Sequence, residues 1–127
     1  MGHRSLDNAQ RALEQLRAYL AEPVVTDCDR AGVIQAFEFT FECVWRLLKH
    51  VAEAHGLTAP SPKRAFSVAL RLGLIQDEKL WLAMLHARNL TSHVYNPAVA
   101  VEIFDAVSQR YASALATAVE SAARERG

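Results

Sequence analysis

The sequence predicts an all-α fold of about five helices, arranged as a single domain over residues 1–127. Apolar residues recur at helical spacing, and four breaks, at residues 21–27, 55–62, 73–79 and 95–97, interrupt the pattern. No run alternates between apolar and polar residues beside a hairpin signal, so we expect no sheet. The length fits one domain, and an apolar fraction of 51% is enough for a core.

Proline and capping residues indicate the bounds of two long N-terminal helices. The first covers about residues 5–21 and ends before Pro23, whose ring cannot continue a helix. The second covers about residues 26–55, where Thr26 with an acidic residue three positions later is close to a capping box. Gly56 takes the position after its end. The buried stripe of the first helix consists of Leu6, Ala9, Leu13, Leu16 and Leu20.

The second helix carries two apolar faces. Phe39 and Cys43 lie well off its main face, with Ala36 and Leu47 at the border. This second stripe is either additional core or a contact between copies of the chain. Glu38 lies on the polar edge, where it could pair with an arginine from another helix. The main face, which we expect in the core, comprises Val33, Ile34, Phe37, Phe41, Val44, Trp45, Leu48 and Val51.

Three further helices follow. The third covers about residues 61–73 and has a proline at its first position. The fourth starts near Asp77. The last starts at Asn96, a cap followed by Pro97, and reaches almost to residue 127.

Charge and cysteine content limit the classes of function. Lys plus Arg and Asp plus Glu number 14 each, so the zero net charge argues against a general nucleic-acid binder but allows a local phosphate site. Cys28 and Cys43 would be about 22 Å apart on one helix, too far for a disulfide. No signal peptide and no apolar run of about 18 residues is visible. We expect a cytoplasmic protein that does not associate with membranes.

The densest polar chemistry lies in ARNLTSHVYN, residues 87–96. Arg88 suits a phosphate, His93 can move a proton near neutral pH, and Asn89 can hold a hydroxyl or a phosphate oxygen. On a regular helix Arg88 and His93 would point about 140° apart. They can act together only if the helix unwinds or if two copies meet across a symmetry axis. The matching reaction is metal-free cleavage of RNA; the alternative is a helix end whose polar residues satisfy the last carbonyls.

Three segments, GVIQAFEFTFECVWRLLKHV, SPKRAFSVALRLGLI and WLAMLHARNLTSHVYN, resemble the nucleotidyltransferase substrate-binding protein family of the HEPN superfamily. The similarity covers roughly residues 6–119. Its most specific part is an arginine, four residues, a histidine, one residue and a tyrosine, here Arg88, His93 and Tyr95. The chain departs from the family at Ala36 and Ala87, where relatives often carry a basic and an acidic residue.

The resemblance implies an up-and-down bundle that forms a homodimer and pairs with a minimal nucleotidyltransferase. This chain would be the non-catalytic, substrate-binding subunit, without a metal or cofactor of its own, because ATP and Mg would be bound mainly by the partner. The sequence does not decide whether the dimer forms through the Phe39 stripe or through the motif face. A composite catalytic site predicts the motif face. The residues expected at the substrate are Arg88, Asn89, His93, Tyr95 and Glu38.

The resemblance also implies an alternative, a HEPN toxin that cleaves RNA without a metal. Arg88 and His93 would then be catalytic. The cognate nucleotidyltransferase antitoxin would silence the toxin by adenylylating Tyr95.

Overall fold

The computed structural model describes residues 2–126, and every regular element in this range is helical. The chain from Pro97 onward is one continuous helix with a π-helical turn, so the described residues form five helices and the predicted fold class is confirmed. The elements are α1 Gly2–Ala21, α2 Asp27–Ala54, α3 Pro62–Arg71, α4 Glu78–Asn89, the 3-10 turn η1 Thr91–His93, α5 Pro97–Ala106, the π turn η2 Val107–Tyr111 and α6 Ala112–Arg126.

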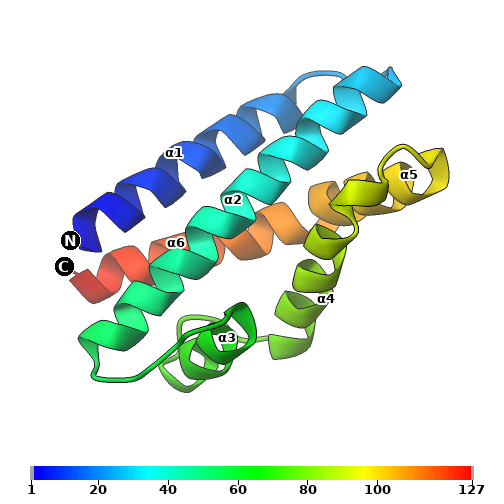
Figure 1. Cartoon of the computed structure of the whole chain (residues 1–127). Helices are drawn as coiled ribbons and strands as arrows, with labels where there is room; N and C mark the ends of the chain where they lie inside the picture. Colours follow the sequence, from blue (N-terminus) through cyan, green and yellow to red (C-terminus); the bar gives the residue numbers. More distant parts are fainter. Residues whose placement is uncertain (1, 127) are drawn as a thin grey trace.

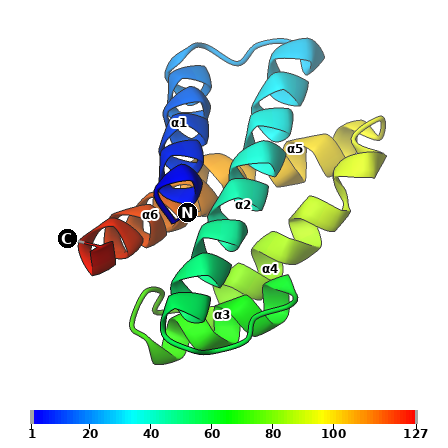
Figure 2. The ribbon, with the colours of Figure 1, turned by 60° about the vertical axis from the view of Figure 1, so that its left-hand side comes forward.

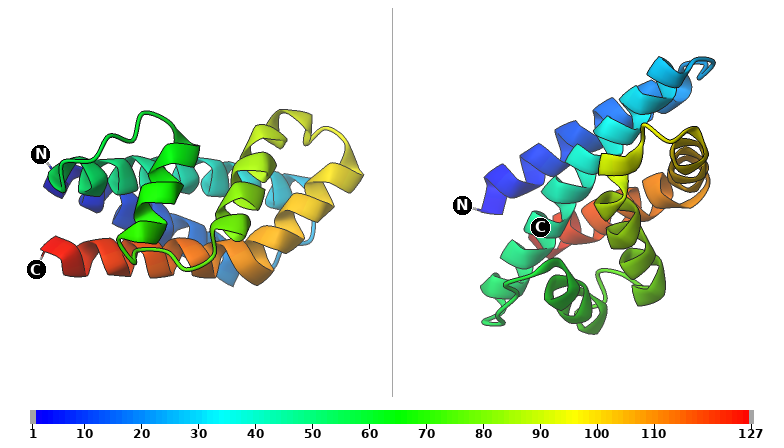
Figure 3. Two further views of the ribbon diagram at one scale, coloured as in Figure 1. Left: turned by 90° about the horizontal axis from the view of Figure 1, so that it is seen from below. Right: turned by 45° about the vertical axis from the view of Figure 1, so that its right-hand side comes forward.

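The long helices α1, α2 and α5–α6 form the body of the bundle (Figure 1). α1 and α2 are antiparallel neighbours, and α1 and α6 place their outer ends at the same end of the molecule (Figures 1 and 2). The short helices α3 and α4 run across the long ones and carry the chain back to the opposite end (Figure 3). One leg of the up-and-down bundle is therefore split into two short helices.

The core is built around α2 and contains a chain of aromatic contacts. Phe37 stacks on Tyr111 at 5.7 Å between ring centroids, and Phe41 meets the edge of Phe66 at 5.9 Å. Phe66 in turn lies 5.2 Å from Trp81. These contacts join α2 to α3 and to the π turn, and α3 in turn to α4, so the short helices are positioned from α2 outward.

Local sequence signals set the helix ends that the sequence predicts. Thr26 and Asp29 form a complete capping box at the start of α2. The side chains of Ser61, Asp77 and Asn96 cap α3, α4 and α5. Gly56 has a φ of 77°, a left-handed conformation that glycine adopts without steric cost, and follows the C-cap of α2.

The residues of the second apolar stripe of α2 differ in burial, so some belong to the core and one is available for an intermolecular contact. Leu47 is 1% exposed and belongs to the core. Ala36 and Cys43 are partly buried and pack against the core. Phe39 remains 58% exposed, so it is the member of the stripe that is open to a partner or a ligand.

The π turn at Val107–Tyr111 is a feature that helical periodicity did not predict. It widens the last helix locally, at the level of α4. In the described part of the chain, no helix combines the length and the hydropathy needed to cross a lipid bilayer.

Candidate functional site

The motif segment lies where α4 ends and the backbone changes direction. α4 ends at Asn89, Leu90 is its C-cap, and η1 tightens the chain into a 3-10 turn. The Thr91 hydroxyl lies 2.7 Å from the carbonyl oxygen of Arg88 and satisfies this helix-end acceptor. The helix therefore does unwind between Arg88 and His93, which is one of the two arrangements that the sequence allowed.

Arg88 reaches across from α4 to α2. Its Nη1 donates to Glu42 Oε1 at 3.3 Å, and the two side chains are 29% and 33% exposed. Its guanidinium carbon lies 5.6 Å from the centroid of the Phe41 ring, a cation–π contact. The Arg88 Nε atom is buried and has no hydrogen-bond partner among the described residues. Arg88 is thus held in a partly desolvated position, and Glu42 occupies only some of its N–H donors.

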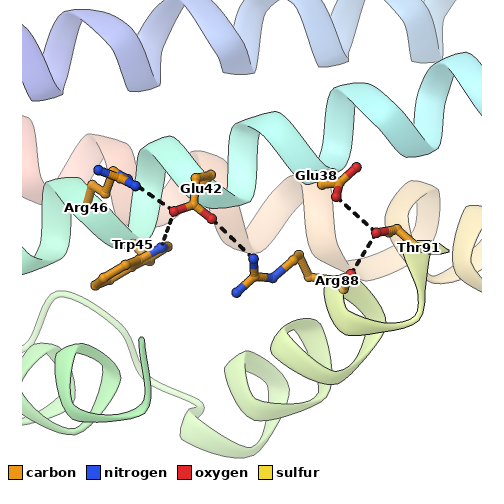
Figure 4. A network of polar contacts seen from close by, with 6 residues as sticks. All are labelled: Glu38, Glu42, Trp45, Arg46, Arg88 and Thr91. Atoms are coloured by element: carbon orange, nitrogen blue, oxygen red, sulfur yellow. Dashed lines mark hydrogen bonds and ion pairs between the residues drawn. The ribbon is translucent and has the colours of Figure 1, made fainter. Parts of the chain in front are cut away.

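Glu42 binds three side chains, and we call the four residues together the Glu42 cluster: Glu42, Trp45, Arg46 and Arg88. Trp45 Nε1 donates to Glu42 Oε2 at 2.9 Å, and Arg46 Nε donates to the same oxygen at 3.1 Å. Figure 4 shows Arg46 and Arg88 on opposite sides of the carboxylate. One negative charge is therefore shared between two permanently charged guanidinium groups.

Glu38 has a different partner from the arginine that the sequence suggested. Its Oε2 lies 3.1 Å from the Thr91 hydroxyl, whose single hydrogen is shared between this carboxylate and the Arg88 carbonyl oxygen (Figure 4), whereas Arg88 pairs with Glu42, one turn later on α2. The physical reason is register. Glu38 and Glu42 are four residues apart and share a face of α2, so the packing of α4 decides which of them the arginine meets.

Asn89, His93 and Tyr95 are the exposed part of the motif. The His93 and Tyr95 rings lie 6.0 Å apart between centroids, and Tyr95 is 81% exposed. Among the described residues Arg88 and His93 share no hydrogen bond, and each has a different neighbour: Arg88 contacts Glu42, and the His93 ring lies near Tyr95. The structure thus brings together Arg88, Glu42, Thr91 and Glu38, and separately His93 and Tyr95.

Tyr95 also lines a hollow of about 310 Å³ between the motif segment and the first turn of α2. The other residues of its wall are Asp27, Cys28, Arg30, Ala31, Val94, Pro97 and Ala100. His86, on the same helix as Arg88, lines a second hollow of about 380 Å³ beside α5 and the π turn. Within the described residues, no group of three or more His, Cys, Asp or Glu is arranged to hold a metal ion.

Sequence reasoning did not identify the Glu42 cluster. The spacings from Glu42 to Trp45 and to Arg46 are three and four residues, so contacts within α2 were readable from the sequence. The contact with Arg88 joins residues 46 positions apart, and local spacing carries no signal for it.

A family model described as "Nucleotidyltransferase substrate binding protein like" matches residues 4–124. A Haemophilus influenzae protein named probable ribonuclease HepT is 31% identical over 112 residues, which cover 78% of this chain and 77% of the relative.

Two solved structures share the fold. A crystal structure of a Thermus thermophilus protein superposes with a TM-score of 0.82 at 32% identity, over 90% of this chain and 98% of that one. A Haemophilus influenzae protein, whose structure is described as revealing the fold of a substrate binding domain of a nucleotidyltransferase, superposes with a TM-score of 0.75 at 27% identity, over 93% and 96%. With its motif segment at the end of α4 and a family match over residues 4–124, the chain belongs to the nucleotidyltransferase substrate-binding protein family.

Proposed function

We propose that this chain is the substrate-binding, non-catalytic subunit of a two-component nucleotidyltransferase and that it pairs with a minimal nucleotidyltransferase chain. The family match and the structural relative described as a nucleotidyltransferase substrate binding domain support the proposal. The observation that carries the proposal is that one part of the motif is held against α2 while the other part is exposed. Arg88 is fixed against α2 by Glu42, while His93 and Tyr95 are exposed to whatever docks on the end of α4.

In this proposal each motif residue has a binding role. The fixed guanidinium of Arg88 orients an anionic or carbonyl group of the acceptor. Binding costs little side-chain entropy, because Glu42 already holds this guanidinium in place. Asn89, His93 and Tyr95 present amide, imidazole and phenol groups for hydrogen bonds, and Glu38 holds η1 through Thr91. ATP and Mg are bound mainly by the partner, which carries out the transfer.

Co-expression with a minimal nucleotidyltransferase from the same genome tests the proposal. We expect the two chains to co-purify, and nucleotidyl transfer from ATP to a third molecule to require both of them. His93→Ala and Tyr95→Ala should weaken the complex or the acceptor affinity. The matched substitution His55→Ala, at the C-cap of α2, should change neither. Two chains that elute separately, with the transferase fully active alone, would contradict the subunit role.

A second candidate is a metal-independent ribonuclease with RNA as its substrate, and the relative named probable ribonuclease HepT favours it. Arg88 would stabilise charge on the phosphorus and His93 would transfer a proton. Because one histidine cannot be acid and base at once, the reaction calls for a homodimer in which two motif faces form one cleft and supply two histidines. Tyr95, at 81% exposure, is accessible for adenylylation by a cognate transferase acting as antitoxin.

Incubation of the purified chain with RNA in EDTA separates the two candidates. A ribonuclease cleaves RNA under these conditions and loses activity in both Arg88→Ala and His93→Ala. The same chain co-expressed with the transferase would gain mass in steps of one adenylate, and Tyr95→Phe would abolish the gain. An intact RNA substrate would leave the subunit role as the function.

A further inference from the structure

The hollow of about 380 Å³ between α4, α5 and the π turn is separate from the motif contacts, and we call it the π-turn hollow. Its polar wall includes His86, Glu102, Asp105, Arg110 and Tyr111. α4 runs across the long C-terminal helix at this place (Figure 3). His86 is two residues before the motif arginine, so the two side chains leave a regular helix about 160° apart. The hollow therefore lies on the side of α4 that faces away from Glu42.

Tyr111 is a buried residue of this wall whose hydroxyl lacks a partner. It is 4% exposed, and its ring stacks on Phe37 in the core. Among the described residues its hydroxyl makes no hydrogen bond, although it is not one of the fully enclosed atoms without a partner. Burial raises the pKa of the Tyr111 phenol, so the group stays protonated and can donate. Because buried tyrosines normally find a partner, this donor calls for an acceptor from outside the chain.

Opposite charges line the π-turn hollow without pairing. Glu102 and Asp105 are three residues apart and share one side of α5. The Arg110 guanidinium carbon lies 5.4 Å from the centroid of the Tyr111 ring. None of these three charged side chains takes part in the ion pairs of the described residues. Two carboxylates and one guanidinium therefore border the same space with their charges unmatched.

The π turn brings the charges to one place. Asp105 and Arg110 are five residues apart and would point about 140° apart on a regular helix. Both nevertheless line the hollow, because π-helical hydrogen bonds join residues five positions apart and alter the helical register. Such turns are rare and occur frequently at functional sites. The local geometry thus favours a binding role for this wall.

We propose that the π-turn hollow binds a small zwitterion, an α-amino acid with an apolar side chain. The ammonium group pairs with Glu102 and Asp105, and the carboxylate accepts from Arg110 and the Tyr111 hydroxyl. The volume is at the lower end of the roughly 300–1,000 Å³ of ligand pockets, which suits a molecule of this size. The apolar part of the wall, which contacts the ligand's side chain, consists of Ala83, Ala87, Leu90, Ile103 and Ala106.

Simpler occupants leave part of the wall unsatisfied. A lone cation would neutralise a carboxylate but leave Arg110 and the Tyr111 hydroxyl unused. A lone anion would meet the repulsion of Glu102 and Asp105. Water alone suits exposed charges, but it leaves a 4% exposed hydroxyl beside an apolar wall without a fixed partner. A zwitterion matches both signs and the apolar surface. The inference goes beyond the proposed function, because it concerns a different side of α4.

Titration of the full-length chain with leucine, followed by amide NMR, tests the inference. We expect saturable shifts at the end of α4, in α5 and in the π turn. Leucinamide lacks the carboxylate and isocaproate lacks the ammonium group, so each should bind at least about tenfold more weakly than leucine. Glycine, which lacks the apolar side chain, should also bind more weakly.

Three substitutions locate the site. Asp105→Asn and Arg110→Gln should each lower the affinity for leucine about tenfold, because each removes a charged partner. Tyr111→Phe keeps the ring in the core and should lower the affinity several-fold without lowering the melting temperature, since its hydroxyl has no partner in the chain. A tyrosine retained for a structural hydrogen bond predicts a loss of stability instead. Glu120→Gln and Arg11→Gln, exposed residues of α6 and α1, are the matched controls and should leave binding unchanged.

Absence of saturable shifts with leucine would overturn the inference. Equal affinities of leucine, leucinamide and isocaproate would do the same, because the wall would then not read both charges. Unchanged binding in Asp105→Asn, Arg110→Gln and Tyr111→Phe would place the ligand elsewhere. The titration uses the chain without a transferase, so its failure is distinguishable from failure of the proposed function. Thermal melting of each variant checks that the fold is retained.

Discussion

Glu42 accepts hydrogen bonds from Trp45, Arg46 and Arg88, although its side chain is 33% exposed. The contact with Arg46 lies on the surface of one helix, where such pairs contribute a few tenths of a kcal/mol. The contact with Arg88 is different, because it joins α4 to α2 and involves a partly desolvated guanidinium. Loss of Glu42 would leave a charged group without its acceptor in that position.

Glu42→Ala should therefore lower the free energy of unfolding by about 1 kcal/mol. Urea denaturation followed by circular dichroism measures the change. Glu53→Ala, an exposed glutamate on the same helix, is the control and should stay within about 0.5 kcal/mol of the wild type. Equal stability of both variants would mean that the Arg88 contact contributes nothing to the fold.

The two cysteines have different surroundings, which predicts different reactivities. Both are free thiols, with Cys28 exposed and Cys43 partly buried. Burial, followed by the nearby Glu42 carboxylate, raises the pKa of the Cys43 thiol. Since the thiolate is the reactive form, less of Cys43 is reactive at a given pH.

A thiol reagent at about pH 8 should modify Cys28 first and Cys43 several-fold more slowly. The rate at Cys43, isolated in Cys28→Ser, should reach half of its plateau at a pH above about 8.5, the ordinary pKa of a thiol. Time-resolved intact mass provides the measurement. A Cys43 that reacts first would contradict the burial seen in the structure.

At the scale of elements, α2 depends on the cap at its N-terminus. The Asp29 carboxylate accepts from the backbone N–H groups of Thr26 and Val25, each at 3.0 Å, and the Thr26 hydroxyl accepts from Asp29 N. These bonds, led by the one from the Thr26 backbone, lower the pKa of Asp29. The folded state therefore favours the ionised carboxylate.

The lowered pKa of Asp29 predicts how the cap responds to acid. Its stabilisation is fully present above the ordinary carboxyl pKa of about 3.9 and is lost as pH falls through the lowered value in the folded state. The difference in melting temperature between the wild type and Asp29→Ala should be constant above about pH 5 and shrink below about pH 4. Asp7→Ala on α1 serves as the control. A difference in melting temperature that grows on acidification would mean that the pKa of Asp29 is not lowered in the folded state.

At the scale of the whole molecule, Phe66 connects three helices. It contacts Phe41 on α2 and Trp81 on α4 from its own position on α3, and it is fully buried. α3 and α4 are short, so their stability comes from packing on the long helices rather than from their own hydrogen bonds. The aromatic contacts therefore hold the split leg of the bundle in place.

Phe66→Ala should cost about 3–5 kcal/mol, a large part of the roughly 5–15 kcal/mol typical of a domain. Because one core joins all helices, we expect a single transition in which tryptophan fluorescence and helical circular dichroism change together. Leu70→Ala, a 38% exposed residue of the same helix, should cost much less. An early, separate fluorescence transition would show that α3 and α4 unfold on their own.

The sequence alone determined the helices, their caps and the motif segment, because each depends on residues within a few positions of one another. Thr26, Ser61, Asp77 and Asn96 cap helices wherever the chain packs. The break between Arg88 and His93 was one of the two arrangements that the sequence left open, and the structure shows it at the end of α4.

The tertiary structure alone decided which of two glutamates meets Arg88, and which residue of the second apolar stripe remains exposed. Helical periodicity places Glu38 and Glu42 on one face, and Phe39 and Leu47 in or beside one stripe, without deciding which of them is buried. The distinction comes from how α4 and its neighbours pack on α2, which depends on contacts between residues far apart in the chain. Arg88 with Glu42 is such a contact, across 46 positions.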